Sequence, residues 1–96
     1  MAGNSTCYVY ILWMSNRKHY TGLTNSIIRR MEQHDKGYSK STKWYRPVKL
    51  IWVTEVLDRK TARRLEVRIK NRGAKLFLLD QRFRPNRIHK NVLHNI

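Results

Sequence analysis

The sequence predicts a single small α/β domain built on a short sheet. Three observations support this fold class: a length of 96 residues, a hydrophobic content of 41%, and β-branched or aromatic runs that alternate with helical patterns. A chain of this length forms one compact domain and can bury a modest core. The expected order of elements is strand, strand, helix, strand, helix, helix.

The first two elements read as a β-hairpin. Residues 7–14, Cys-Tyr-Val-Tyr-Ile-Leu-Trp-Met, have the aromatic and β-branched composition of a largely buried strand. A polar turn at 15–18 leads into a second strand at 19–23. The connection is so short that the two strands must be antiparallel. Cys7 is the only cysteine, and we expect it to be a small strand residue. A single cysteine without a partner suits a protein of a reducing compartment.

A helix and a basic loop follow the hairpin. Thr24 or Asn25 is expected to cap a helix that runs to about Lys36, where Gly37 stops it. The loop at 38–47 interleaves cationic and aromatic side chains.

One strand and two helices complete the pattern. The third strand is expected at 48–57, and the pattern alone leaves its place in the sheet open. Asp58 is a good cap for a second long helix that ends near Asn71. Gly73 separates this helix from a short third one at 74–81.

Charge is the strongest feature of the composition. Lys and Arg number 21 against 6 Asp and Glu, a formal net charge of +15. Such an excess is typical of proteins that neutralise phosphates and release their counterions. No apolar run approaches the roughly 20 residues of a membrane helix, and no secretory signal is visible. We therefore expect a soluble, cytoplasmic or nucleoid-associated protein without membrane contact, with a domain over 1–81 and a basic tail over 82–96.

The second long helix carries a carboxylate beside its apolar stripe. Ala62, Leu65 and Ile69 share that stripe, and Glu66 falls on its edge among basic residues. In one interpretation Glu66 pairs with a neighbouring arginine. In the other it binds Mg²⁺, which proteins often hold through one or two carboxylates plus substrate phosphate.

The first helix and the hairpin offer further candidates. Arg30 and His34 are four residues apart and can reach one phosphate together, or they are a surface arginine and a half-buried histidine. Tyr8 and Tyr10 point to one face of the first strand, and Tyr20 lies on its hairpin partner. Packing is the usual role of such tyrosines, but a buried phenol near cations can have a lowered pKa and act as a base.

Gly22 follows directly after Tyr20 and Thr21. A glycine at this point of a strand indicates a close backbone approach or a bend.

The order and spacing of Tyr8-Val9-Tyr10, Tyr20-Thr21-Gly22, Arg30, His34 and Glu66 resemble the GIY-YIG nuclease domain. The chain is most similar to the small stand-alone, URI-domain-like members, over about residues 7–80. The resemblance implies a three-stranded antiparallel sheet flanked by helices. It also implies phosphodiester hydrolysis with one divalent metal, Mg²⁺ or Mn²⁺.

The resemblance also implies roles for individual residues. Tyr20 would be the general base, with Tyr10 hydrogen-bonded nearby. Arg30 would neutralise phosphoryl charge, His34 would orient the water or relay a proton, and Glu66 would hold the metal. Contacts to flanking nucleic acid are expected from Lys40, Lys43, Trp44, Tyr45, Arg46 and Lys70.

Two departures from the family pattern are visible. Tyr8 stands where the first motif has its glycine, which is usual in the small subgroup. Asn71 follows Glu66 too closely to be the asparagine that some members carry later in the chain.

The predicted function is therefore a metal-dependent endonuclease acting on DNA, whether single-stranded, duplex or branched, with RNA as an alternative substrate. We expect specificity to come either from the structure of the substrate or from a partner protein, because a catalytic domain this short has little room for a separate reader. One alternative is a catalytically silent nucleic-acid-binding module on the same scaffold, which would not need a carboxylate among phosphates. Another is a basic protein that associates with a ribonucleoprotein.

Overall fold

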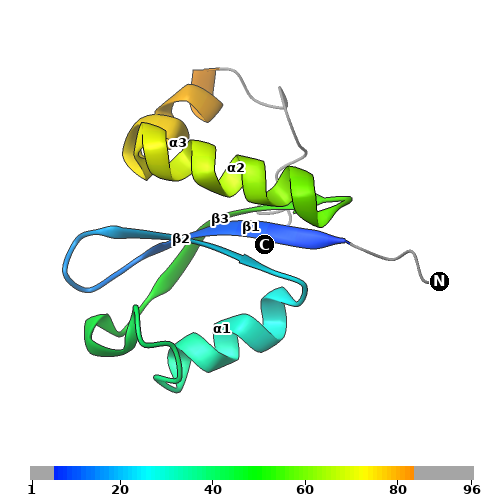
Figure 1. Ribbon diagram of the computed structural model, residues 1–96. Helices are drawn as coiled ribbons and strands as arrows, with labels where there is room; N and C mark the ends of the chain where they lie inside the picture. Colours follow the sequence, from blue (N-terminus) through cyan, green and yellow to red (C-terminus); the bar gives the residue numbers. More distant parts are fainter. Residues whose placement is uncertain (1–5, 84–96) are drawn as a thin grey trace.

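A computed structural model describes residues 6–83 as a three-stranded antiparallel sheet with helices on both faces (Figure 1). The strands are β1 (Cys7–Trp13), β2 (His19–Thr24) and β3 (Lys49–Val56). The helices are α1 (Ile27–Asp35), the single 3₁₀ turn η1 (Lys43–Tyr45), α2 (Arg59–Arg72) and α3 (Ala74–Phe83). The predicted basic tail over 82–96 lies outside the described residues, except that its first two positions belong to α3.

β1 is the central strand of the sheet, whose order is β2-β1-β3. It pairs antiparallel with both neighbours, which places Tyr10 opposite Gly22 on one side and Val53 on the other. The ladder with β3 shifts register between Ile11 and Leu12, so that Ile51 is an extra residue in β3. The third strand, whose position the sequence pattern left open, therefore docks on β1.

Two apolar clusters lie on opposite faces of the sheet. Because successive side chains of a strand alternate between faces, Val9 and Ile11 point toward α2 and α3 while Tyr10 and Leu12 point toward α1 (Figure 1). The fully buried His34 closes the second cluster from the α1 side. The helix that carries Arg30 and the helix that carries Glu66 thus cover different faces.

The N-terminus of α1 differs from the prediction, because Ser26 is its N-cap. The Ser26 hydroxyl accepts from the backbone N–H of Arg29 at 3.4 Å. Thr24 Oγ1 accepts a hydrogen bond from the backbone N–H of Ser26 at 3.1 Å, and Asn25 Oδ1 accepts from the Arg29 guanidinium at 3.0 Å. Thr24, Asn25 and Ser26 are all capable caps, and only Ser26 has an extended backbone directly before the first helical turn.

The predicted Asp58 cap of α2 and the glycines after α1 and α2 are confirmed, whereas α3 extends to Phe83, beyond the predicted end at Gln81. Asp58 caps α2 by accepting from the N–H of Thr61 at 2.7 Å. Gly37 follows α1 with φ +79°, and Gly73 follows α2 with φ +89°. Residues that carry a side chain rarely adopt such values. Within residues 6–83, none of the helices is both long and apolar enough to cross a membrane.

Candidate active site

The candidate site is built around Tyr10 of β1. Its side chain is completely buried on the α1 face of the sheet. Gly22 lies opposite it on β2, and a Cβ at that position would overlap the Tyr10 phenol. The predicted close approach at Gly22 is therefore confirmed: the absent side chain makes room for the phenol that reaches across β2.

A chain of hydrogen bonds passes through the Tyr10 hydroxyl. Arg30 Nε donates to it at 3.3 Å, and its oxygen lies 2.9 Å from Nε2 of His34. On the far side of the imidazole, Nδ1 lies 2.7 Å from Oγ1 of Thr42. Arg30 also donates through Nη1 to Gln33 at 2.9 Å. The four-residue spacing on α1 brings Arg30 and His34 to one group, as the sequence indicated, but the shared group in the structure is the Tyr10 phenol, and His34 is fully buried rather than half-buried.

The pKa values of these groups decide the direction of the hydrogen bonds. Burial raises the pKa of Tyr10 to about 12, although its hydrogen bond from Arg30 acts in the opposite direction. Burial, and then the charge of Arg30, lower the pKa of His34 to about 4. At neutral pH the phenol is protonated and the imidazole is neutral. The Tyr10 oxygen accepts from Arg30, and Nε2 of His34 is within reach of the Tyr10 O–H, so we assign this O–H as the donor to Nε2. In the corresponding tautomer Nδ1 carries the proton and donates to Thr42.

The expectation that a buried phenol near cations has a lowered pKa is therefore wrong for Tyr10. The cost of burying a phenolate outweighs the attraction of the one guanidinium that contacts it.

Tyr20 is the more accessible of the two phenols. Its ring centroid lies 6.4 Å from that of Tyr10 and 5.5 Å from that of His34, and its side chain is partly exposed. Hydrogen bonds to Tyr10 and, to a smaller extent, Tyr20 raise the pKa of Arg30. Four of the five predicted catalytic residues thus gather on the α1 face, with Tyr20 at the accessible side.

Glu66 approaches from α2, on the other face of the sheet. The residue is 7% exposed and lies beside Ala62, Leu65 and Ile69, so its predicted place at the edge of the apolar stripe is confirmed. Its carboxylate pairs with Arg63 at 3.5 Å and with Lys70 at 3.3 Å. The pairing with a neighbouring arginine that the sequence allowed is therefore present.

The donor groups limit the kind of metal site that Glu66 can make. Residues 6–83 contain no group of three or more His, Cys, Asp or Glu side chains that could hold an ion. Mg²⁺ is commonly bound by one or two carboxylates together with substrate phosphates and water. A single, nearly buried carboxylate fits an ion that arrives with its phosphate substrate and does not fit a closed protein cage.

The residues predicted to contact nucleic acid divide into two groups. Lys40, Lys43 and Trp44 are exposed, and Trp44, at 77% exposure, lies under the Lys43 ammonium, which is 5.0 Å from its ring. Tyr45 is also exposed. Arg46, in contrast, donates to the backbone carbonyls of residues 43 and 35 at 3.0 and 3.2 Å, so it ties the loop to the end of α1.

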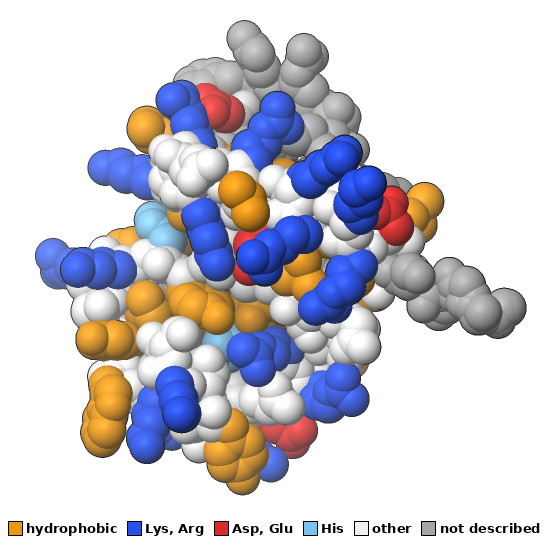
Figure 2. Space-filling model, in the orientation of Figure 1, with side chains coloured by type: hydrophobic (Ala, Val, Ile, Leu, Met, Phe, Trp, Pro, Cys, Tyr) orange, Lys and Arg blue, Asp and Glu red, His pale blue; other side chains and the backbone are white. Residues whose placement is uncertain are grey.

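On the face of the molecule that Figure 2 shows, the basic residues are spread out and do not form one narrow track. Figure 2 shows Lys and Arg side chains distributed across the helices on both sides of the sheet, with few acidic side chains between them. A surface of this kind attracts a polyanion from many directions.

Thr42 and Gln33 are the site residues that sequence reasoning missed. Thr42 is fully buried, although its neighbours in the 38–47 loop are mostly exposed cations and aromatic residues. A threonine four residues before a basic Arg-Pro pair gives no periodic signal. Gln33 is visible only as a polar residue three positions after Arg30 on the same helix.

Comparisons with known proteins agree with this geometry. Residues 6–78 match the family model of the GIY-YIG catalytic domain. A UPF0213 protein of Vibrio cholerae is 38% identical over 68 residues, which cover 69% of this chain and 67% of that protein. A UPF0213 protein of Autographa californica nuclear polyhedrosis virus is 34% identical over 95 residues, covering 96% and 91%. The solution NMR structure of a UPF0213 protein from Bacillus halodurans has a similar fold, with a TM-score of 0.51 and 31% identity over 78% of this chain and 83% of that one.

Proposed function

The chain belongs to the GIY-YIG catalytic domain family, a family of the nuclease type, and from this premise we propose that it is a divalent-metal-dependent endonuclease that hydrolyses phosphodiester bonds in DNA. The observation that carries the proposal is the hydrogen-bonded chain from Arg30 through Tyr10 to His34, next to the accessible phenol of Tyr20. The net charge of +15 supports a polyanionic substrate.

Arg30 and Tyr20 are the residues that meet the substrate in this proposal. Arg30 has five N–H donors, and its bonds to Tyr10 and Gln33 leave others for phosphoryl oxygens. These donors stabilise the negative charge that builds on the phosphoryl group during attack. Tyr20, the phenol nearer to solvent, acts as general base in its phenolate form, which takes the proton of the attacking water and becomes the neutral phenol.

Tyr10 and His34 have a supporting role. Both are uncharged at neutral pH, because burial raises the pKa of Tyr10 and lowers that of His34. A hydrogen bond to Thr42 orients the imidazole of His34, the imidazole orients the Tyr10 phenol, and the phenol oxygen orients the guanidinium of Arg30. This series keeps Arg30 aimed at the phosphate before the substrate arrives, which is the pre-organisation that transition-state stabilisation requires.

Glu66 is the residue that would hold Mg²⁺ or Mn²⁺. When bound, such an ion supplies Lewis-acid stabilisation of the scissile phosphate and of the departing oxygen. To hold the ion, Glu66 would have to give up its ion pairs with Arg63 and Lys70, and these two cations would then be available to neighbouring phosphates.

A cleavage assay with a matched pair of variants tests the proposal. Single-stranded, duplex and flap DNA, with single-stranded RNA as comparison, are incubated with Mg²⁺, Mn²⁺ or EDTA. Glu66→Gln should lower the cleavage rate at least about a hundredfold while DNA binding persists, because several kcal/mol of metal-based stabilisation are lost. Glu32→Gln makes the same chemical change at an exposed carboxylate that pairs with Lys36 at 3.3 Å, and it should cut normally.

Two results would contradict the proposal in different ways. A parent protein that binds DNA in a salt-dependent manner and cuts nothing with either metal would be a silent binding module. A Glu66→Gln variant that cuts as fast as the parent would show that Glu66 does not bind the metal.

A further inference from the structure

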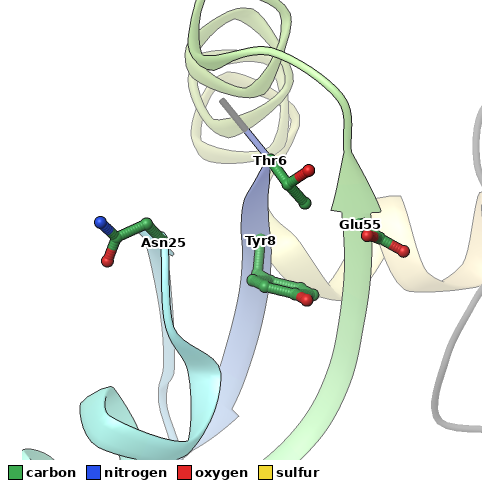
Figure 3. Close-up of a pocket in the computed structure, with 4 residues that line it drawn as sticks. All are labelled: Thr6, Tyr8, Asn25 and Glu55. Atoms are coloured by element: carbon green, nitrogen blue, oxygen red, sulfur yellow. The ribbon is translucent and has the colours of Figure 1, made fainter. Parts of the chain in front are cut away.

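Two adjoining pockets lie beside Arg30, at one end of the sheet, and the proposed reaction leaves most of their lining unused. The first has a volume of about 440 Å³ and is lined in part by Arg29, Arg30 and Arg59. The second has a volume of about 370 Å³ and is lined by Thr6, Tyr8, Asn25 and Glu55 (Figure 3). Asn25 lines both pockets, so they are neighbours.

The first pocket has the chemistry of a phosphate site. Three guanidinium groups line it, no carboxylate does, and the groups come from two helices on opposite faces of the sheet. Arg29 is held by its hydrogen bond to Asn25 at 3.0 Å, and Arg59 is the first residue of α2. Guanidinium groups bind phosphate oxygens in pairs of parallel hydrogen bonds.

The second pocket has the opposite charge and an aromatic wall. Tyr8 and Glu55 are cross-strand partners on β1 and β3, so their side chains share one face of the sheet. Figure 3 shows the Tyr8 ring extending from β1 toward β3, the strand that carries Glu55. Within residues 6–83, Glu55 makes no ion pair, whereas Glu32, Glu66 and Asp80 all do. A bare carboxylate next to a ring repels phosphate and accepts hydrogen bonds from N–H groups.

We propose that the two pockets together bind one unpaired guanine nucleotide of a nucleic-acid strand. Arg29 and Arg59 hold its phosphate, Tyr8 stacks on its base, and Glu55 accepts from the base. Guanine is the one common base with two adjacent donors, N1–H and the N2 amine, on its Watson–Crick edge, and these match the two oxygens of a carboxylate. Unpaired bases are commonly read in this way, by stacking on an aromatic ring and by hydrogen bonds to that edge.

The subsite adds a base preference to the proposed nuclease, and its role beside Arg30 rests on that proposed function. A strand that places its scissile phosphate on Arg30 would place a neighbouring nucleotide in these pockets. The enzyme would then prefer to cut close to an unpaired guanine, which would give the domain a limited base preference.

Equilibrium binding without metal tests the subsite. Short single-stranded oligothymidylates with one central guanine, inosine or adenine are titrated with the full chain in EDTA, and binding is followed by fluorescence anisotropy. The guanine oligonucleotide should bind about tenfold more tightly than the adenine one. The inosine oligonucleotide should be intermediate, because inosine lacks the N2 amine.

Matched variants assign the preference to individual residues. Glu55→Gln should reduce the guanine preference to less than about twofold, and Glu32→Gln should keep it. Arg59→Gln should weaken every oligonucleotide equally and lower the salt slope by about one. Lys60→Gln removes the same charge from the next position of α2, outside the pocket lining, and should have a smaller effect.

Several outcomes would overturn the inference. Equal affinity for the guanine and adenine oligonucleotides would do so, as would a guanine preference that survives Glu55→Gln. Free guanosine monophosphate that binds as tightly as the guanine oligonucleotide would show a mononucleotide site instead of a strand site. None of these measurements depends on cleavage, so their failure is distinguishable from a failure of the nuclease proposal.

Discussion

The hydrogen bond between His34 and Thr42 offers a direct test of how the site is held. Thr42→Val keeps the shape of the side chain and replaces its hydroxyl with a methyl group. Both residues are fully buried, so water cannot take the place of the lost oxygen. A buried N–H without an acceptor costs about 1–3 kcal/mol, and the free energy of unfolding should fall by that amount. For a domain of this size each kcal/mol lowers the melting temperature by about 4–8 °C.

Thr42→Ser is the matched control, because it keeps the hydroxyl and removes only a methyl group, at a cost of about 1 kcal/mol. Urea denaturation of the three proteins at neutral pH measures the stabilities, and ¹⁵N NMR of the His34 ring shows which nitrogen carries the proton. The valine variant should also cut DNA more slowly, since Tyr10 and Arg30 lose their support. A valine variant as stable as the parent would refute the role of Thr42. An unprotonated Nδ1 in the parent would reverse the direction assigned to the chain of hydrogen bonds.

Two further perturbations follow from the same packing. Gly22→Ala adds a Cβ that overlaps the Tyr10 phenol, so it should cost about 1–3 kcal/mol of stability and slow cleavage. Gly73→Ala should also lower stability, because of the φ of +89° at Gly73, but its Cβ meets open space, so the folded variant should cut at the parent rate. Burial holds the pKa of His34 at about 4, below the 6.5 of an exposed imidazole, so between these values the unfolded chain binds more protons than the native one. Stability should therefore be intact above pH 6.5 and fall by up to about 3 kcal/mol as the pH drops to 4. Denaturation at a series of pH values should show this acid loss in the parent and not in His34→Gln, and equal curves for the two proteins would contradict the assignment.

The secondary structure could be predicted to within a few residues because its signals are local. The aromatic and β-branched run from Cys7, the short turn after it and the Asp58 cap each act within a few positions. The docking of β3 on β1 could not be predicted, since it joins distant segments and includes the extra residue Ile51. The cap of α1 was misplaced because three consecutive polar residues compete for one position, and the local turn at Thr24 decides among them.

The candidate site was only partly accessible from the sequence. The spacing of Arg30 and His34 on one helix is a local pattern that predicts that the two side chains lie together, but it does not predict that both contact Tyr10. The raised pKa of Tyr10 could not be predicted, because it depends on how completely two strands and α1 enclose the phenol. Thr42 was missed because its burial arises from the path of a loop without periodicity.

The central position of β1 has a consequence for how this scaffold can be varied. β1 is hydrogen-bonded along both edges and lies between two apolar clusters, so the backbone of Tyr10 cannot shift without disturbing both ladders. The 38–47 loop, in contrast, has a single 3₁₀ turn and no strand pairing. Tyr10 therefore lies on the most rigid element of the site, and the 38–47 loop is the segment that can be replaced. A different loop grafted at these positions can change the contacts to nucleic acid without changing the catalytic residues. It must place one hydroxyl within hydrogen-bond distance of Nδ1 of His34.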